Sequence, residues 1–332
     1  MKIGEDEILR VWDLSVKFYT YAGVVHAVSD VSLHVKEAET IALVGETGCG
    51  KTVTTRAITR LIEPPGRIEH GRALFRKRNG SVVDLLKIDE EELREIRGNE
   101  ISYVFQDPTS ALDPLYTIGY HIYETLSAHT AKVDKSKALK HAVNLLRQVL
   151  IPSPEVRVKN YPHEMSGGMR QRGVIAISLT NYPRLIIADE PTTNLDVTVQ
   201  AQILDLLKKL QKELKLGLIL ITHNLGIVAE ISDRVYVMYA GKVVEEGKVE
   251  SIFYNPQHPY TKLLLRAVPN PTKRLEKLES IPGVVPSLIN PPPGCRFQPR
   301  CPFAIDICTK QEPPRSEIED QHAVYCWLLQ KT

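Results

Sequence analysis

The chain contains the stretch Gly45-Glu46-Thr47-Gly48-Cys49-Gly50-Lys51-Thr52, and this stretch decides its fold. It fits the phosphate-loop pattern G-x-x-x-x-G-K-[ST] at every required position. The apolar run of residues 40–44 before it predicts a buried strand, and residues 53–58 after it can begin a helix. In that context backbone N–H groups and the dipole of the helix start attract a phosphate. The sequence therefore predicts a nucleoside triphosphate site, in which Lys51 contacts the β- and γ-phosphates and Thr52 coordinates Mg²⁺.

The composition narrows the classes of protein to consider. The chain has 332 residues, enough for two domains, with 43% apolar and 25% charged residues, as in an ordinary globular protein. A net charge of +2 gives no electrostatic reason to expect a nucleic-acid partner. No run approaches the ~18 apolar residues of a membrane span, and residues 1–7 lack the apolar core of a secretory signal. We expect a cytosolic protein that meets a membrane only through a partner.

Hydrophobic periodicity predicts an α/β fold. Alternation between Ile8 and Val35 predicts antiparallel strands, including strands at 25–28 and 31–35, and Asn79-Gly80 predicts the turn of a second strand pair. Helical periodicity over residues 115–180 predicts an inserted helical subdomain. Short apolar runs predict a mostly parallel sheet with both faces covered, and a closing hairpin follows. These runs are residues 40–44, 101–105, 185–190, 218–221 and 235–238. After about residue 265 frequent prolines predict irregular structure.

Polar residues follow three of these apolar runs. The pair Asp189-Glu190 ends one run, at the edge where open α/β sheets bind ligands. Asp189 suits Mg²⁺, and Glu190 suits a general base that polarises the attacking water. Gln106 is placed to contact Mg²⁺ or the water, and His223 to reach the γ-phosphate. Each of these polar residues could instead be a solvated strand end without a functional role. The phosphate loop in the same chain favours the functional interpretation.

A second anion-binding surface is predicted by Met165-Ser166-Gly167-Gly168-Met169-Arg170-Gln171-Arg172. Ser-Gly-Gly before a helix offers a hydroxyl and backbone N–H groups to an anion. Because one chain needs only one phosphate loop, this surface suggests a nucleotide held by another subunit. Six motifs together resemble ABC-type ATPase domains in order and spacing over residues 8–265. They are the phosphate loop, Gln106, Ser166-Gly167-Gly168, Asp189-Glu190, Asn194-Leu195-Asp196 and His223.

This resemblance implies a head-to-tail dimer that sandwiches two ATP molecules and closes and opens as ATP is hydrolysed. Each ATP would lie between Lys51 of one subunit and the Ser166-Gly167-Gly168 segment of the other. The resemblance also implies that an aromatic residue before the phosphate loop stacks on adenine. Phe18 is the candidate, with Tyr19 and Tyr21 as alternatives, and a core position is the structural alternative for Phe18. Residues implied in catalysis are Lys51, Gln106, Glu190 and His223, with Asp196 among the nucleotide-binding residues.

Four of the five cysteines lie near the C-terminus, at Cys295, Cys301, Cys308 and Cys326. Their spacing, C-x5-C-x6-C-x17-C, lacks the close pairs that structural zinc sites usually show. Four thiolates can hold a [4Fe–4S] cluster, and Arg296 and Arg300 would offset its negative charge. The spacing by itself leaves iron–sulfur and zinc open, and disulfides or plain buried cysteines remain as alternatives.

Further segments resemble the oligopeptide/dipeptide importer branch of ABC ATPases, and its first ATPase subunit in particular. They are Gly66-Arg67-Ile68, Phe105-Gln106-Asp107-Pro108, His258-Pro259-Tyr260-Thr261, Ile281-Pro282-Gly283-Val284-Val285-Pro286 and the cysteine tail. The resemblance implies a [4Fe–4S] cluster on the four cysteines. It implies an ABC ATPase domain at 5–265, with a helical subdomain at about 107–180, and a Pro/Cys-rich module at 266–332.

The function implied is ATP hydrolysis that powers peptide import from the cytoplasmic face of the cell membrane. Implied partners are a related second ATPase subunit or a second copy, two integral-membrane permeases and an extracytoplasmic substrate-binding protein, with no nucleic acid. Oligosaccharide or nickel import within the same branch is an alternative. A soluble ABC ATPase acting on DNA or ribosomes is another, and the chain lacks the long heptad region or second ATPase domain usual there. A redox sensor, in which the cluster gates hydrolysis, is compatible with the importer.

Overall fold

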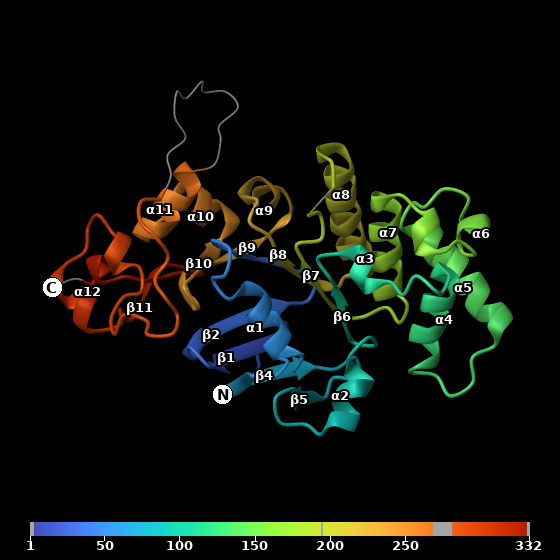
Figure 1. Cartoon of the computed structure of the whole chain (residues 1–332), viewed down its shortest axis with the longest axis horizontal. Coiled ribbons are helices and arrows are strands. Elements are labelled where there is room, and N and C mark those ends of the chain that lie inside the picture. Colours follow the sequence, from blue (N-terminus) through green and yellow to red (C-terminus); the bar gives the residue numbers. More distant parts are fainter. Residues whose placement is uncertain (1–2, 194, 268–280, 331–332) are drawn as a thin grey trace.

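The computed structural model describes residues 3–193, 195–267 and 281–330 of the chain. Its strands form an eight-stranded sheet through the middle of the molecule and a four-stranded antiparallel sheet beside it. The helices of residues 108–178 gather at one end, and the C-terminal segment lies at the opposite end (Figure 1). The α/β fold with an N-terminal antiparallel sheet, predicted from the periodicity, is confirmed.

Five parallel strands make up the centre of the large sheet. They are β3 (Thr40–Val44), β6 (Ile101–Val104), β7 (Leu185–Asp189), β8 (Gly217–Ile221) and β9 (Arg234–Tyr239). Across the sheet they run in the order β9-β3-β8-β7-β6. Nearly all their residues are buried, because the antiparallel sheet packs on one face and helices pack on the other, and this explains why each appears in the sequence as a continuous apolar run. The sequence predicted all five.

Three antiparallel strands extend this sheet beyond β9. They are β10 (Lys242–Lys248), β12 (His322–Tyr325) and β11 (Arg315–Glu319), in that order across the sheet. The hairpin of β9 and β10 agrees with the sequence prediction. The expectation of irregular structure after residue 265 is wrong for β11 and β12, which are too short to show a clear alternation. Because β12 pairs with β10, the segment that contains the four cysteines is joined to the main sheet.

The second sheet has the strand order β2-β1-β4-β5. Its strands are β1 (Glu7–Thr20), β2 (Gly23–Lys36), β4 (Gly66–Arg76) and β5 (Val82–Asp84). Residues 25–28 and 31–35, predicted as two strands, belong to the single strand β2, which continues through Asp30 at a positive φ of 52°. The predicted turn at Asn79-Gly80 connects β4 to β5.

The helices outside residues 108–178 lie against the two sheets or in the C-terminal segment (Figure 1). They are α1 (Lys51–Ile58), α2 (Glu90–Ile96), α8 (Val197–Leu214), α9 (Leu225–Ile231), α10 (Val249–Tyr254) and α11 (Pro259–Arg266), and α12 (Asp306–Lys310) lies in the cysteine-bearing segment. In α8 the apolar residues that recur at helical spacing, such as Ile203, Leu207 and Leu210, are buried, which gives the helix one apolar face. Among the helices described, none is both long and apolar enough to cross a membrane.

A group of helices follows β6 and stands together at the end of the main sheet (Figure 1). It consists of α3 (Pro108–Ala111), α4 (Ile118–Ser127), α5 (Lys135–Gln148), α6 (Pro154–Arg157) and α7 (Gly167–Ser178). Their buried faces share one hydrophobic cluster with β7, β8 and α8, to which Ile118, Leu146 and Ile175 contribute. The helical character predicted for residues 115–180 is confirmed.

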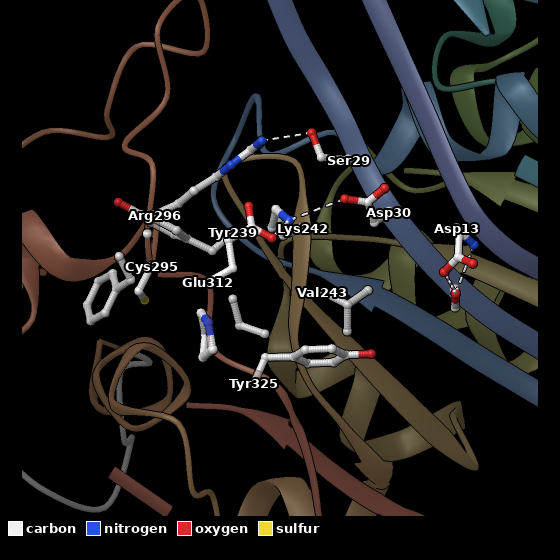
Figure 2. Close-up of a pocket in the computed structure, with 15 residues that line it drawn as sticks. Asp13, Ser29, Asp30, Tyr239, Lys242, Val243, Cys295, Arg296, Glu312 and Tyr325 are labelled. Carbon is white, nitrogen blue, oxygen red and sulfur yellow. Dashed lines mark hydrogen bonds and ion pairs between the residues drawn. The ribbon is translucent and has the colours of Figure 1, made fainter. Parts of the chain in front are cut away.

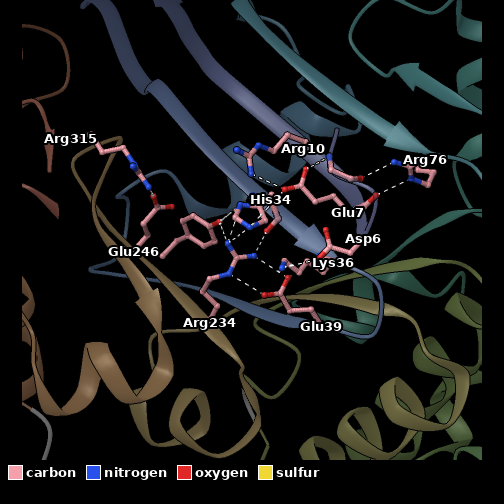
Figure 3. A network of polar contacts seen from close by, with 12 residues as sticks. Asp6, Glu7, Arg10, His34, Lys36, Glu39, Arg76, Arg234, Glu246 and Arg315 are labelled. Atoms are coloured by element: carbon pink, nitrogen blue, oxygen red, sulfur yellow. Dashed lines mark hydrogen bonds and ion pairs between the residues drawn. The ribbon is translucent and has the colours of Figure 1, made fainter. Parts of the chain in front are cut away.

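A polar network joins the two sheets (Figure 3). Arg234, at the start of β9 and 3% exposed, donates to both carboxylate oxygens of Glu39 at 3.0 and 2.9 Å and to the His34 carbonyl at 2.9 Å. Burial, with the neighbouring Arg234 charge, lowers the pKa of His34 to about 2, so this imidazole stays neutral. The network fixes β2 against β9, and so holds the antiparallel sheet in place.

Candidate functional site

The predicted phosphate loop connects β3 to α1. Gly45 and Gly50 adopt φ values of 147° and 103°, which favour glycine. A Cβ atom on Gly45 would collide with the Met238 carbonyl, and one on Gly50 would lie 2.6 Å from the Ala27 carbonyl oxygen. Because these neighbours are backbone atoms, packing as well as backbone conformation requires glycine at both positions.

The Lys51 ammonium group points back onto its own loop. Its Nζ atom donates to the carbonyl oxygens of Gly45 and Glu46 at 2.8 and 3.1 Å, and the residue is buried. Burial raises the pKa of the neighbouring Cys49 thiol, which therefore stays protonated and serves packing. The loop thus holds a positive charge where a phosphate would be expected.

A cleft of about 370 Å³ opens over the loop. Its lining includes residues of the loop together with the ends of β6, β7 and β8. The lining residues are Ala27, Thr47, Gly48, Gly50, Lys51, Thr52, Val53, Gln106, Glu190 and His223. Sequence reasoning had named all of these except Ala27 and Val53, whose apolar side chains carry no motif. The structure therefore brings the predicted residues of four separate segments to one place.

Asp189, at the end of β7, is buried beside Thr52, one of the residues that line the cleft. Its two carboxylate oxygens accept hydrogen bonds from the Thr52 hydroxyl and the Tyr103 hydroxyl, each at 3.0 Å. Burial raises the pKa of Asp189, while these two bonds oppose the rise. The Thr52 and Asp189 oxygens are hard ligands of the kind that Mg²⁺ prefers. Sequence reasoning missed Tyr103, since a tyrosine inside an apolar strand gives no sign of this contact.

Three side chains contact the carboxylate of Glu190. The Oε2 atom accepts from Gln106 Nε2 and from Thr193 Oγ1, each at 3.0 Å, and the Oε1 atom lies 3.3 Å from His223 Nδ1. The residue has a positive φ of 45°, and its N–H donates to the Ile221 carbonyl at 2.9 Å. Backbone strain of this kind persists where the surroundings fix it, often at functional sites.

The Ser-Gly-Gly segment lies apart from this cleft. Ser166 is exposed and caps α7, where its Oγ atom accepts from the Met169 N–H at 3.3 Å. Asp196 caps α8 in the same way, accepting from the Val199 N–H at 3.0 Å. Asn194, which belongs to the same motif, lies outside the described residues. The exposed helix start at Ser166 is a surface that another chain can reach.

The aromatic candidates for adenine occupy different surroundings. Phe18 is partly buried in β1 and packs against the hydrophobic core beside Gly66. Tyr19 donates from its hydroxyl to Glu69 at 2.9 Å. Tyr21 is fully exposed beyond the end of β1. Of the three side chains, Phe18 has the core contacts, Tyr19 is bonded to Glu69, and Tyr21 is exposed to solvent.

The four C-terminal cysteines come together as free thiols, two buried and two half-buried. Burial raises the pKa of Cys295 to about 11, and the nearby thiols of Cys308, Cys326 and Cys301 add to the rise. The backbone N–H of Cys295 donates to the Cys308 carbonyl at 2.8 Å. Within residues 3–193, 195–267 and 281–330, no three His, Cys, Asp or Glu side chains are arranged to hold a single metal ion.

The two arginines of this segment form hydrogen bonds and an ion pair with residues other than the four cysteines. Arg296 reaches toward the N-terminal sheet, donating to the Ala240 carbonyl and to Ser29 Oγ at 2.7 Å. Figure 2 shows it extending to Ser29 beside a cavity of about 210 Å³ that Cys295 also lines. Arg300 pairs with Glu46 of the phosphate loop. These contacts do not test the expectation that both arginines offset the charge of four thiolates, which stays a prediction.

Comparison with known families gives two matches. Residues 28–193 match the family described as ABC transporter. Residues 244–308 match the one described as oligopeptide/dipeptide transporter, C-terminal region. The first match includes the phosphate loop, and the second includes three of the four C-terminal cysteines, Cys295, Cys301 and Cys308.

Similar proteins extend over nearly the whole chain. A putative peptide import ATP-binding protein of Brucella melitensis is 50% identical over 331 residues, which is 98% of each chain. The oligopeptide transport ATP-binding protein OppD of Bacillus subtilis is 49% identical over 97% of this chain and 89% of its own. Among solved structures, a dimeric post-hydrolysis state of an ATP-binding cassette bound to ADP and Pi matches with a TM-score of 0.63 and 26% identity. It covers 73% of this chain and 98% of that one.

Proposed function

The chain belongs to the ABC transporter family, among the ATP-binding subunits of oligopeptide/dipeptide importers, and we propose from this premise that it hydrolyses ATP to power peptide import. The observation that carries the proposal is the convergence of the phosphate loop, Gln106, Glu190 and His223 on one cleft. The near full-length similarity to peptide import ATP-binding proteins supports the cargo class. Because the similar proteins include oligopeptide as well as dipeptide transport ATP-binding proteins, their names leave the length of the peptide open.

ATP binding is assigned to the loop from Gly45 to Thr52. Backbone N–H groups and the Lys51 ammonium would neutralise the phosphate charge, and Lys51 would exchange its present carbonyl partners for phosphate oxygens. Thr52 and Asp189 would hold Mg²⁺, with Gln106 nearby. When bound, that ion would stabilise charge on the phosphates.

Hydrolysis is assigned to the group around Glu190. Its carboxylate would accept the proton of the attacking water. Gln106 and His223 would orient this carboxylate through the hydrogen bonds described above. His223 would also donate to the γ-phosphate. Because Glu190 sits at a strained, fixed backbone position, its carboxylate is held ready without rearrangement.

A second nucleotide-binding subunit would complete the site. The exposed Ser166-Gly167-Gly168 helix start would contact the ATP bound by the partner, with Asp196 nearby on α8. The dimeric form of the similar ATP-binding cassette supports this arrangement. The partner would be a related second ATPase subunit or a second copy of this chain. Phe18, or the exposed Tyr21, would stack on adenine.

The four cysteines would hold a [4Fe–4S] cluster. Their chemistry fits this group, because four free thiols gather in one partly buried segment. When bound, the cluster would supply a one-electron redox centre.

The remaining assignments concern assembly. We place the chain at the cytoplasmic face of the membrane, under two permeases fed by a substrate-binding protein. The segment from Gln106 to Pro114 and the helices α3 to α7 would contact the permeases. This proposal divides the chain into an ATPase domain at 5–265, with its helical subdomain at about 107–180, and a module at 266–332. It also assigns the chain to the first of the two ATPase subunits of such importers. Residues 268–280, at the boundary, lie outside the described residues.

Affinity isolation from detergent-solubilised native membranes, with mass spectrometry of the partners, tests the proposal. We expect two permeases, an ATPase partner and a binding protein, whose bound ligand identifies the cargo. A binding protein loaded with oligosaccharide or nickel would replace the peptide assignment. Recovery of only ribosomal or DNA-bound proteins would overturn the importer and leave ATP hydrolysis in place.

A further inference from the structure

Arg300, in the segment that bears the cysteines, contacts the phosphate loop directly. Its Nη1 and Nη2 atoms pair with the two carboxylate oxygens of Glu46 at 2.7 and 3.1 Å. The Arg300 side chain is 4% exposed, and the Glu46 side chain is 26% exposed. A bidentate ion pair of this kind fixes the orientation of the two side chains as well as the distance between them. The second residue of the loop is thus held by a residue 254 positions away.

The guanidinium of Arg300 is itself held rigidly. Its Nε atom donates to the Pro282 carbonyl at 2.8 Å, Nη2 donates to the Ile281 carbonyl at 3.2 Å, and Nη1 reaches the Tyr239 hydroxyl at 3.3 Å. Its central carbon lies 5.7 Å from the centre of the Tyr239 ring. Since these partners come from β9 and from the C-terminal segment, any shift of that segment would be transmitted to Glu46.

Tyr260 of α11 holds the backbone of the same loop residue. Its hydroxyl accepts a hydrogen bond from the Glu46 N–H at 2.9 Å, and its side chain is fully buried. The ring packs on Tyr239 and on Phe297, with ring centres 4.6 and 5.4 Å apart. Phe297 stands between Cys295 and Cys301 in the sequence. Both the N–H and the carboxylate of Glu46 are therefore held from outside the motif.

The opposite side of the Glu46 peptide faces the functional lysine. The Glu46 carbonyl accepts a hydrogen bond from Lys51 Nζ at 3.1 Å. Glu46 is absent from the described residues that line the cleft, so its side chain would act on ATP only through the position of the loop. The loop is thus held between Arg300 and Tyr260 on one side and Lys51 on the other.

We propose that Arg300 is a positioning residue for the phosphate loop, through which the cysteine-bearing segment sets the affinity for the phosphates of ATP. The inference rests on the proposed function only in taking ATP as the ligand of the loop. It predicts an effect mainly on ATP binding and on KM, with a smaller effect on kcat, because the residues around Glu190 are untouched.

A double-mutant cycle on the full-length chain tests the coupling. The probe is trinitrophenyl-ATP, displaced by ATP in the presence of Mg²⁺. We expect Arg300→Gln and Glu46→Gln each to weaken ATP binding by about tenfold, the value of one charged hydrogen-bonded contact. The double variant should be no weaker than either single variant, because both remove the same contact. Arg300→Lys keeps the positive charge and loses the bidentate geometry, so its affinity for ATP should lie between those of Arg300→Gln and the wild type.

Arg315→Gln is the matched control. Arg315 also ties the C-terminal segment to the main sheet, donating to Glu246 at 2.8 and 3.1 Å (Figure 3), and neither residue is among the described residues that line the cleft over the loop. We expect its ATP affinity to equal that of the wild type. Melting temperatures of all variants separate loss of folding from loss of affinity. If Arg300→Gln does not fold, Glu46→Gln still tests the contact, because Glu46 is partly exposed and tolerates the change better.

Three results would overturn the inference. They are an unchanged ATP affinity in folded Arg300→Gln or Glu46→Gln, fully additive effects in the double variant, and an equal loss in Arg315→Gln. A wild-type chain that does not bind the probe or ATP would instead overturn the proposed function, and the inference with it.

Discussion

The Nδ1 atom of His223 lies 3.3 Å from the Oε1 atom of Glu190, and the two residues follow the neighbouring strands β8 and β7. The other oxygen of the same carboxylate accepts from Gln106 and Thr193. One carboxylate therefore joins residues from three segments of the chain. The contact places a base and a hydrogen-bond donor on the same edge of the cleft, where the γ-phosphate of ATP is proposed to lie.

Glu190→Gln should abolish hydrolysis and retain ATP. The amide keeps the shape of the side chain but cannot accept a proton from water, and loss of a general base costs about two to four orders of magnitude in rate. Phosphate release measures the rate, and size-exclusion chromatography with ATP detects the dimer that we expect to accumulate. Normal turnover would refute the assignment of the base.

His223→Ala should slow hydrolysis less than Glu190→Gln does. The variant removes one donor to the γ-phosphate, an effect of about ten- to a hundredfold, and leaves Glu190 held by Gln106 and Thr193. Single-turnover phosphate release compares the two variants. A loss in His223→Ala as large as that in Glu190→Gln would mean that histidine, and not glutamate, dominates the chemical step.

His322→Gln should reduce stability more at low pH than at high pH. The Nε2 atom of His322 lies 2.8 Å from Oε1 of Glu245, with both side chains fully buried, and this hydrogen bond raises the pKa of His322 above 6.5. Stability from a raised histidine pKa is fully present below pH 6.5 and is lost as the pH rises through the raised value. Removal should lower the unfolding free energy by about 2 kcal/mol in the acidic range and by less above it.

Denaturant unfolding at about pH 6 and about pH 9 measures this difference. The control is His70→Gln, because His70 pairs with Asp30 at 3.1 Å on the exposed surface, where such pairs contribute little. An equal loss of stability at both pH values in His322→Gln would contradict the assigned protonation.

Anaerobic purification should yield iron and acid-labile sulfide in equal amounts. Four thiolates and four irons with four sulfides are expected for each chain. Cys308→Ser should lose the iron, because it removes one buried ligand. Cys49→Ser is the matched control: Cys49 belongs to the phosphate loop, and its variant should keep the iron content of the wild type. Zinc without sulfide would refute the cluster.

Sequence reasoning was most effective where chemistry is local. The phosphate loop between β3 and α1, and the polar residues at the ends of β6, β7 and β8, are recognisable because the spacing of residue types fixes their geometry over a few positions. The five central strands were recognisable because burial on both faces demands continuous apolar runs. The strands β11 and β12 were missed, since each is short and follows a proline-rich stretch.

By itself, the sequence determined the α/β fold, the phosphate loop and the residues around it. Only the tertiary structure decided that Arg300 holds Glu46, that Arg234 holds Glu39 and His34, and that Tyr103 donates to Asp189. The physical reason is that these contacts join residues far apart in the chain, and hydrophobic periodicity says nothing of which polar side chains meet. Charge and residue type allow many such pairs, and only the folded path of the backbone selects among them.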